Sequence, residues 1–366
     1  MGESPSPVMR VSCEWGNQSR SHVFMFFSME SLLQLIKNRM KIKNTTAFKS
    51  IEIIKTLAKL GTRQGAVARR ACTFIDTLLK KNKIPFLVET FDTYIPVVQE
   101  ARLVIDGKKQ PCVGCGMTSG DIPTTHIASS LMSSRFLIDT PTIYFNPKCP
   151  VPSPTNFSFA PAIAIAPGIL EKLVYARQAK ASLRVRKQKT EASFLLVGNR
   201  VNPKTIIFSH YDSLGPGAID NASGTAVALS VATRCSKENI LDETLFVFDG
   251  NEEISYDYPV YWGHGYRVFE ERYQALLKNA KAVLVVDCVG NGRNYFIQDE
   301  TILKLAFPLK NVEQIKHKTW LLSGDIEDLM TVYHSEKDTT KKVSLRQLRQ
   351  AEDILFERIQ ANAHFA

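Results

Sequence analysis

The sequence predicts an α/β fold in which a mostly parallel central sheet is flanked by helices and carries a smaller β-rich inserted subdomain. Four short apolar runs follow residue 190, and they read SFLLVG, TIIFSH, TLFVFDG and AVLVVDCVG. The helical stretches SGTAVALSVATRCSK and GYRVFEERYQALLKNA come after the second and the third run. Buried apolar strands that alternate with helices are typical of a parallel sheet covered on both faces.

The N-terminal part of the chain predicts helices and one strand. Residues 1–28 are expected to form a disordered leader, because the apolar run VFMFF is shorter than a secretory core of about 7–15 residues. Apolar residues recur at helical spacing over 31–60, and a second helix is predicted over 63–81. The run NKIPFLVETF then predicts the first strand, so the first part of the main domain is assigned to residues 29–99.

The inserted subdomain is predicted over residues 100–190. Its first stretch, VVQEARLVIDGKKQ, alternates and turns at Asp106–Gly107, which is a hairpin signal. An irregular part follows, with PCVGCG, DIPTTH and NPKCPVPSPTNFSF. The stretch PAIAIAPGILEKLVYARQAKASLRVRKQ then predicts a strand, a helix that begins near Pro167 and a further strand. The main domain resumes at residue 191 and runs to residue 366.

The composition bears on partners as well as on fold. A formal net charge of +10 and a pI of about 9.2 would suit nucleic-acid binding. However, the basic residues are spread along the chain, and no basic–aromatic interleaving indicates a base-stacking surface. No run of 18 or more apolar residues predicts a transmembrane helix. We therefore expect neither nucleic acid nor a membrane as a partner, while an oligomer stays open.

The seven cysteines are too scattered to indicate a disulfide framework. Cys112 and Cys115 form a lone CVGC, which lacks the second pair of ligands that a zinc ribbon needs. A turn with two thiols is favoured, and a local redox pair or disulfide is the alternative. The thiols favour a reducing compartment, so a cytoplasmic location is expected.

Acidic and histidine residues stand where the predicted strands end, which is where open α/β sheets bind ligands. Any one of them alone is explained as a helix cap or a turn residue. Together they form an ordered series along the chain: His210, Asp212, Asp220, Glu252, Glu253, Asp287 and His334, with Asp338 behind the last. Such a series predicts a functional site at the carboxyl edge of the sheet.

The series resembles the M28 metallopeptidases, which are zinc-dependent aminopeptidases with two metal ions. The matching pieces are SHYDS, GAIDNASGTAVALSVA, NEE, VVDCVG and VYHSEKDT, and they cover about 190–345, with a weaker match over 50–95. The inserted subdomain resembles a protease-associated (PA) subdomain in its position and in PAIAIAPGILEKLV. The resemblance implies a zinc exopeptidase fold, with the di-zinc catalytic domain at 191–366.

The resemblance also implies a role for each residue of the series. It implies five ligands for two Zn²⁺ ions per chain: His210 and Asp287 for one ion, Glu253 and His334 for the other, and Asp220 as a bridge. Glu252 is implied as the general base, and Asp212 as the carboxylate that orients His210. The peptide bond Asp220–Asn221 is implied to be cis.

The chemistry of these residues agrees with a two-metal site. A carboxylate bridge holds two ions about 3.5–4 Å apart. Nitrogen and oxygen ligands without thiolate suit Zn²⁺, although Mn²⁺ or Co²⁺ could also fit. Two stretches depart from the family pattern, NEE in place of AEE and SGDIEDL in place of a Ser-Asp-His stretch, and neither departure removes a ligand.

The aromatic stretch after Glu253 offers candidates for a substrate pocket. It reads ISYDYPVYWGHGYRVFE, and with the residue before His334 it supplies the substrate-binding candidates Tyr256, Tyr258, Trp262 and Tyr333. Packing under a loop is an equal alternative for Tyr256, Tyr258 and Trp262, and for Tyr261 and Tyr266. Tyr333 is a candidate donor to a tetrahedral oxyanion. His264 in GHG is expected to be a turn residue rather than a third metal ligand.

The resemblance predicts an aminopeptidase with a peptide substrate, in which a free N-terminus binds near the metals. A carboxypeptidase, a dipeptidase or a glutaminyl cyclase could use the same residues, and a cyclase of this kind would hold one zinc ion. A non-enzymatic, receptor-like binding protein is a further alternative, which the complete ligand set argues against.

Overall fold

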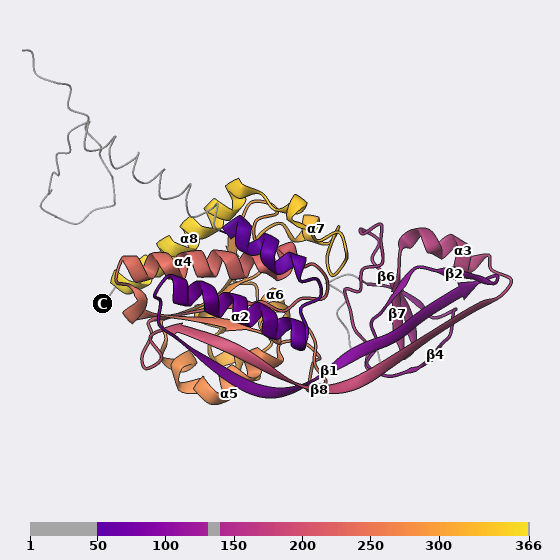
Figure 1. The fold of residues 1–366 in the computed structure, drawn as a ribbon, viewed down its shortest axis with the longest axis horizontal. Helices are drawn as coiled ribbons and strands as arrows, with labels where there is room; N and C mark the ends of the chain where they lie inside the picture. The colour runs from indigo at the N-terminus through magenta and orange to yellow at the C-terminus, as the bar shows by residue number, and fades with distance from the viewer. Residues whose placement is uncertain (1–49, 131–139, 365–366) are drawn as a thin grey trace, which may run out of the picture. The chain divides into compact units, whose positions relative to one another are not determined.

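The computed structural model describes residues 50–130 and 140–364 of the chain (Figure 1). These residues belong to one compact unit that begins at residue 43. The predicted leader over 1–28, and the part of the predicted helical spacing that precedes residue 50, lie outside the described residues.

The main sheet has nine strands in the order β12-β13-β11-β9-β10-β8-β1-β2, with β4 paired to β8. Its centre consists of four parallel strands: β13 (Thr319–Ser323), β11 (Ala282–Val286), β9 (Thr205–His210) and β10 (Thr244–Asp249). The outer strands are antiparallel: β12 (Tyr295–Ile297), β8 (Ala179–Gly198), β1 (Phe86–Ile105), β2 (Lys108–Gln110) and β4 (Gly120–Ile122). The predicted fold class is therefore confirmed, with parallel strands at the centre of the sheet.

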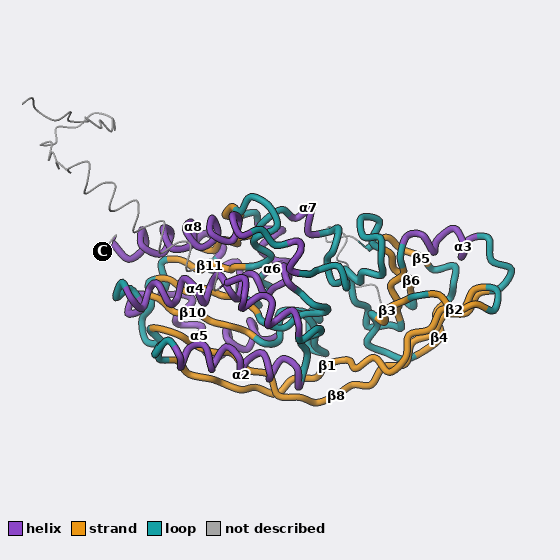
Figure 2. The backbone as a smooth tube through the Cα atoms, turned by 45° about the horizontal axis from the view of Figure 1, so that its top comes forward, coloured by secondary structure: helices purple, strands orange, loops and turns teal. Residues whose placement is uncertain are grey.

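Helices cover both faces of this sheet (Figure 2). On one face, α2 (Ala66–Lys81), α4 (Gly224–Lys237) and α8 (Leu345–His364) share a hydrophobic core with strand residues such as Ile207 and Phe246. On the other face, α5 (His264–Asn279) and α6 (Glu300–Ala306) pack against the alternate residues Phe208 and Val247. Successive strand residues thus point into different cores, which explains why the predicted strands are apolar throughout.

The predicted helices are found with small shifts. The helix predicted over 63–81 is α2, which begins at Ala66 after Gly65 has turned the chain with a φ of 52°. A helix near Pro167 is present as the short η2 (Pro167–Ile169) and α3 (Leu170–Val174). The remaining short elements are a helix over 50–59, η3 (Ala218–Ser223), η4 (Leu241–Glu243), η5 (Val312–Gln314), η6 (Lys316–Lys318), α7 (Ile326–Leu329) and η7 (Thr340–Lys342).

A long two-stranded ribbon leads from the main sheet to a second sheet. Strands β1 and β8 have 20 residues each and pair from Phe86↔Val197 to Ile105↔Ala179. Beyond them lies a sheet in the order β3 (Cys112–Gly114), β7 (Ala162–Ile165), β6 (Thr142–Phe145) and β5 (Ile127–Ser129). The hairpin predicted at Asp106–Gly107 joins β1 to β2. Both long strands cross the predicted limits of the insert, and its assignment as a PA subdomain stays a prediction.

The predicted strand SFLLVG is the last part of β8, and it pairs antiparallel with β10. The sequence hides this continuity because the middle of β8 has no apolar run. Its charged residues, such as Arg184 and Lys189, are exposed on the ribbon. A strand with solvent on both sides has no apolar pattern to reveal it.

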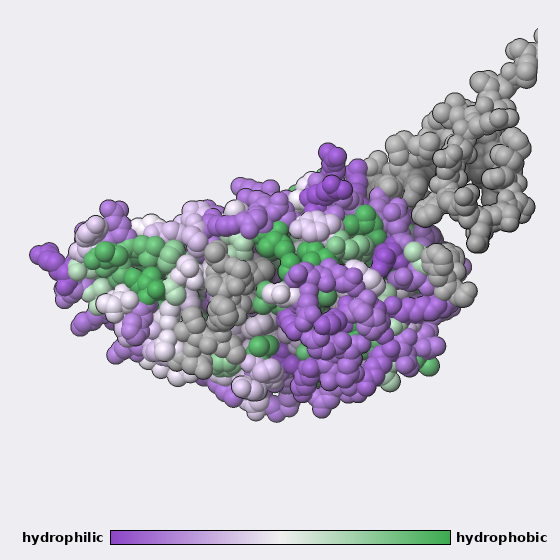
Figure 3. Space-filling model, turned by 180° about the vertical axis from the view of Figure 1, so that it is seen from behind, coloured by the Kyte–Doolittle hydropathy of each residue, from purple (hydrophilic) through white to green (hydrophobic). Residues whose placement is uncertain are grey.

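The face shown in Figure 3 is mostly polar, with separate apolar patches. Tyr175 and Tyr258 are among the most exposed large hydrophobic residues that the structure describes. Isolated apolar residues of this kind are normal on a protein surface. None of the described helices combines the length and the apolar character that crossing a membrane requires.

One buried acid lies in the helical layer, away from the strand ends. Glu352 of α8 accepts a hydrogen bond of 2.6 Å from the hydroxyl of Ser50. Burial raises the pKa of Glu352 from 4.5 to about 7. The folded protein therefore binds more protons than the unfolded chain between these two pH values, and its free energy of unfolding falls as the pH rises through them.

We expect Glu352→Gln to remove this pH dependence, because glutamine stays neutral. At pH 8 the variant should exceed the wild type by up to about 3 kcal/mol in free energy of unfolding, and the two should converge near pH 4. Urea denaturation at several pH values measures the difference. Glu357→Gln, at an exposed position of the same helix, is the matched control and should follow the wild-type curve. A constant difference between Glu352→Gln and wild type at every pH would contradict the prediction.

Candidate metal centre

The residues of the predicted series meet at the carboxyl edge of the parallel strands. His210 is the last residue of β9, Asp287 directly follows β11, and the turn after β10 carries Glu252 and Glu253. Parallel neighbours end at the same edge of a sheet, so residues far apart in the sequence become adjacent. Asp220 reaches the same place from η3.

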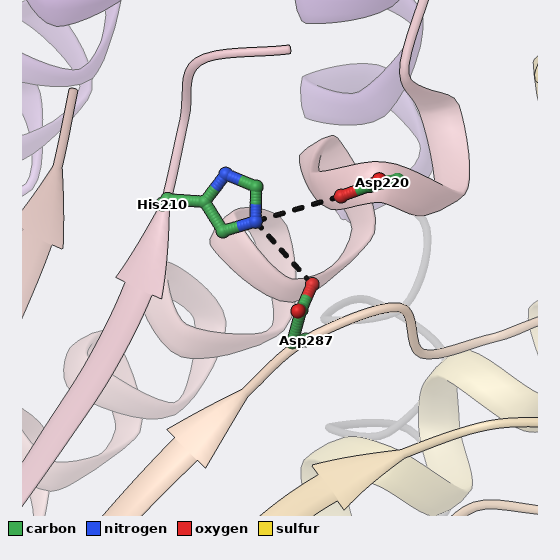
Figure 4. Close-up of side chains that lie close together, drawn as sticks. All are labelled: His210, Asp220 and Asp287. Carbon is green, nitrogen blue, oxygen red and sulfur yellow. Dashed lines mark ion pairs between the residues drawn. The ribbon is translucent and has the colours of Figure 1, made fainter. Parts of the chain in front are cut away.

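The first group of donor atoms consists of His210, Asp220 and Asp287 (Figure 4). The Nε2 atom of His210 lies 3.5 Å from Oδ1 of Asp220 and 3.4 Å from Oδ1 of Asp287. His210 and Asp220 are buried, whereas Asp287 keeps 20% of its side chain exposed. Solvent can therefore approach the first group from the side of Asp287.

The second group consists of Asp220, Glu253 and His334. The Nε2 atom of His334 lies 3.1 Å from Oδ2 of Asp220 and 2.9 Å from Oε2 of Glu253. Asp220 belongs to both groups, with Oδ1 toward His210 and Oδ2 toward His334. One carboxylate thus lies between two sets of nitrogen and oxygen donors, which is the arrangement of a bridging ligand.

The donor atoms are better placed to bind divalent cations than to form hydrogen bonds with one another. Among the described residues, Nε2 of His334 and Oε1 of Glu253 have no hydrogen-bond partner, although both atoms are buried. Buried polar atoms are normally paired, so convergent atoms without hydrogen-bond geometry suggest another partner. Within each group the donor atoms lie within 4.8 Å of one another. Nitrogen and carboxylate oxygen donors of this kind suit Zn²⁺.

The pKa values of His334 and Glu253 are shifted by the negative charge of the second group. Burial lowers the pKa of His334, but the charges of Glu253 and Asp220 outweigh burial and raise it to about 10. Burial and the charge of Asp220 raise the pKa of Glu253 to about 7. Both shifts follow from negative charge gathered in a buried place, and a divalent cation would offset that charge.

Asp212 connects the first histidine to the two glutamates. Its Oδ1 atom lies 3.3 Å from Nδ1 of His210. The same carboxylate accepts hydrogen bonds from the backbone N–H groups of Glu252 at 3.1 Å and Glu253 at 3.0 Å, and from the side chain of Gln64 at 3.0 Å. Asp212 therefore fixes the turn that carries both glutamates as well as facing the imidazole of His210.

The turn that carries Asp220 is held by residues that the sequence pattern does not reveal. The buried guanidinium of Arg63 donates to the backbone carbonyls of Tyr211 at 2.6 Å, Pro216 at 2.7 Å and Gly217 at 3.1 Å. Its signal in the sequence is a single arginine about 150 residues before the turn, outside any motif.

Two further side chains, those of Asp338 and Asn221, hold the turn that carries Asp220. Asp338 accepts hydrogen bonds from the backbone N–H groups of Ile219 at 2.8 Å and Asp220 at 3.0 Å. Asn221 donates to the carbonyl of Val286 at 2.9 Å, which ties the turn to the end of β11. The Asp220–Asn221 peptide bond is cis, as the resemblance implies.

Of the four predicted pocket residues, all within the described part of the chain, Tyr333 lies against a residue of the two donor groups. Its ring stacks on His334 with centroids 3.7 Å apart. Trp262 is buried and donates to the carbonyl of Leu305, while Tyr256 donates to the carbonyl of Met117. Tyr258 is 80% exposed. Their roles in substrate binding stay predictions.

The other members of the aromatic stretch pack elsewhere. Tyr261 and Tyr266 are buried in two different hydrophobic clusters. His264 opens α5, and its Nδ1 atom lies 2.9 Å from Oδ2 of Asp257. His264 is in neither donor group of the described residues, and the expectation that it is not a third metal ligand stays a prediction.

Solved structures with the same fold include three peptidases. The zinc aminopeptidase BSAP from Bacillus subtilis has a TM-score of 0.60 and 16% identity, over 86% of this chain and 95% of that chain. An aminopeptidase from Aneurinibacillus sp. strain AM-1 has a TM-score of 0.56 and 16% identity, over 88% and 95%. A peptidase M28 precursor from Shewanella amazonensis SB2B has a TM-score of 0.58 and 16% identity, over 88% and 96%. At this identity the likeness establishes the fold.

The fold is that of these peptidases, and the donor groups lie at the carboxyl edge of its parallel strands. Residues 196–318 match the model of peptidase family M28, which confirms the resemblance that the motifs predicted. A search of the curated proteins gave no significant match.

Proposed function

We propose that this protein is an aminopeptidase that holds two Zn²⁺ ions and hydrolyses the first peptide bond of its substrate. The observation that carries the proposal is the position of Asp220, which belongs to both donor groups. A carboxylate between two donor sets suits a pair of ions rather than one. His210 and Asp287 would complete one site, and Glu253 and His334 the other.

When bound, the two ions would polarise the substrate carbonyl and lower the pKa of a water molecule. Glu252 is the residue that we assign to proton transfer. It is 7% exposed, and its backbone is fixed by Asp212. Its carboxylate accepts a proton from water as the water oxygen bonds to the carbonyl carbon, and later gives that proton to the leaving amine as the C–N bond breaks.

The proposal is tested with aminoacyl substrates and their N-blocked counterparts, each with and without a chelator. We expect hydrolysis of the free-amine substrates only, loss of that hydrolysis with chelator, and recovery when Zn²⁺ is restored. Equal cleavage of N-blocked peptides would overturn the assignment as an aminopeptidase. Activity that survives complete metal removal would overturn the metal-dependent mechanism.

Metal stoichiometry separates the proposal from a glutaminyl cyclase on the same fold. Two zinc ions per chain support peptide hydrolysis, whereas one ion together with cyclisation of an N-terminal glutamine would favour the cyclase. Elemental analysis of the purified protein gives the ratio directly.

A further inference from the structure

A proline-rich segment lies against the loop that carries His334. This segment, residues 146–155, reads NPKCPVPSPT and has four prolines. It belongs to the irregular part of the chain, about 180 residues before the loop with which it makes contact. None of the metal-site motifs includes it.

The first contact determines which nitrogen of His334 is free. Its Nδ1 atom lies 2.9 Å from the carbonyl oxygen of Pro154. A carbonyl oxygen can only accept a hydrogen bond, so Nδ1 carries the hydrogen of the neutral ring. The lone pair then resides on Nε2, the atom that faces Asp220 and Glu253. A histidine that binds a metal is usually fixed in this way by its second nitrogen.

Two further contacts hold the backbone just before the histidine. The side chain of Asn146 donates to the carbonyl of Met330 at 2.8 Å, and the hydroxyl of Ser153 donates to the carbonyl of Tyr333 at 2.5 Å. Asn146 also donates to Ser153 at 3.0 Å, so the two contacts are linked. Both side chains are fully buried.

The loop needs such support because of its own conformation. His334 has a φ of 50°, which is uncommon for a residue other than glycine. The supporting segment is stiff, because each proline fixes its own φ near −65°. It is also anchored at its far end, where the buried hydroxyls of Thr155 and Ser130 are bonded to each other.

We propose that the proline-rich segment positions His334 for metal binding. The carbonyl of Pro154 selects the tautomer, while Asn146 and Ser153 hold the loop at the distance that the second donor group requires. Asn146 and Ser153 are positioning residues, since their side chains contact the loop backbone, each other and, for Asn146, the backbone N–H of Lys148. The inference rests on the proposed two-metal function, because it concerns the affinity of one of the two sites.

The test is a Zn²⁺ titration of the full chain against a competing chelator, with elemental analysis of the stoichiometry. Ser153→Ala and Asn146→Ala are each expected to lower the affinity for one of the two Zn²⁺ ions by about 10–100-fold. This is the usual effect of removing a partner of a metal ligand. The other ion should keep its affinity. Ser153→Thr keeps the hydroxyl and should bind both ions with the affinities of the wild type.

Ser119→Ala is the matched control. In the sequence, Ser119 also lies between β1 and β8, but its hydroxyl donates to the carbonyl of Val185 at 3.0 Å and not to the loop of His334. This variant should therefore bind both ions like the wild type. Unchanged affinity for both ions in Ser153→Ala and Asn146→Ala would overturn the inference. Equal loss in Ser153→Thr and Ser153→Ala, or loss of both ions together, would also overturn it. A wild type that binds fewer than two ions would instead contradict the proposed function.

Discussion

Glu252→Gln is expected to keep both zinc ions and to lose about 10²–10⁴-fold in kcat. Glutamine has nearly the same shape, and the backbone N–H of residue 252 would still donate to Asp212. What the variant lacks is a carboxylate that accepts the proton of water and returns it to the leaving amine. The loss should therefore appear in kcat, with metal content and KM close to the wild-type values.

Steady-state kinetics on a free-amine substrate, combined with elemental analysis, measures both quantities on the same sample. Glu271→Gln is the matched control, because Glu271 is exposed on α5, and it should retain full activity. Full activity in Glu252→Gln would refute its assignment as the general base. Loss of zinc in this variant would mean that Glu252 acts as a ligand instead.

Asp220→Asn is expected to weaken both zinc ions at once and to abolish hydrolysis. Each donor group uses one oxygen of this carboxylate, and the amide cannot supply negative charge to two cations. At both sites the loss of affinity should exceed about 10–100-fold, which is the effect of removing a residue that only contacts a metal ligand. Competition with a chelator, followed to zero free zinc, gives the two affinities.

Asp287→Asn is the informative comparison, because Asp287 belongs only to the first group. It should weaken one ion and leave the other bound. In the metal-free state, Asp220→Asn should unfold at a higher temperature than the wild type, because it removes one of several buried carboxylates. Wild-type affinity for both ions in Asp220→Asn would rule out the bridging role.

The parts of the fold that the sequence predicts are those with a strong periodic signal. The strands β9, β10 and β11 are apolar throughout because both of their faces are buried. The middle of β8 has no such run, so its junction with the apolar run 193–198 is visible only in the structure. The helix predicted over 63–81 begins at Ala66 instead, because Gly65 turns the chain before it.

The site residues that the sequence predicts are also those with a recognisable pattern. Its acids and histidines stand at strand ends, so their order along the chain indicates their meeting place. Arg63 donates to backbone carbonyls, and the backbone carbonyl of Pro154 accepts from His334. Such bonds do not depend on the side chain of the residue that supplies the carbonyl. A carbonyl is present at every position, so no motif can mark the one that orients His334.

The ribbon of β1 and β8 has a consequence for how this protein could be engineered or diversified. The chain leaves the main sheet and returns to it on neighbouring strands, with Val98 opposite Val185. A short turn could therefore close the gap if everything between them were deleted, and such sites usually tolerate exchange of whole segments. In this chain the excised piece would include Asn146, Ser153 and Pro154. A shortened protein could thus keep the central parallel strands of its main sheet while its second donor group lost the contacts that hold His334.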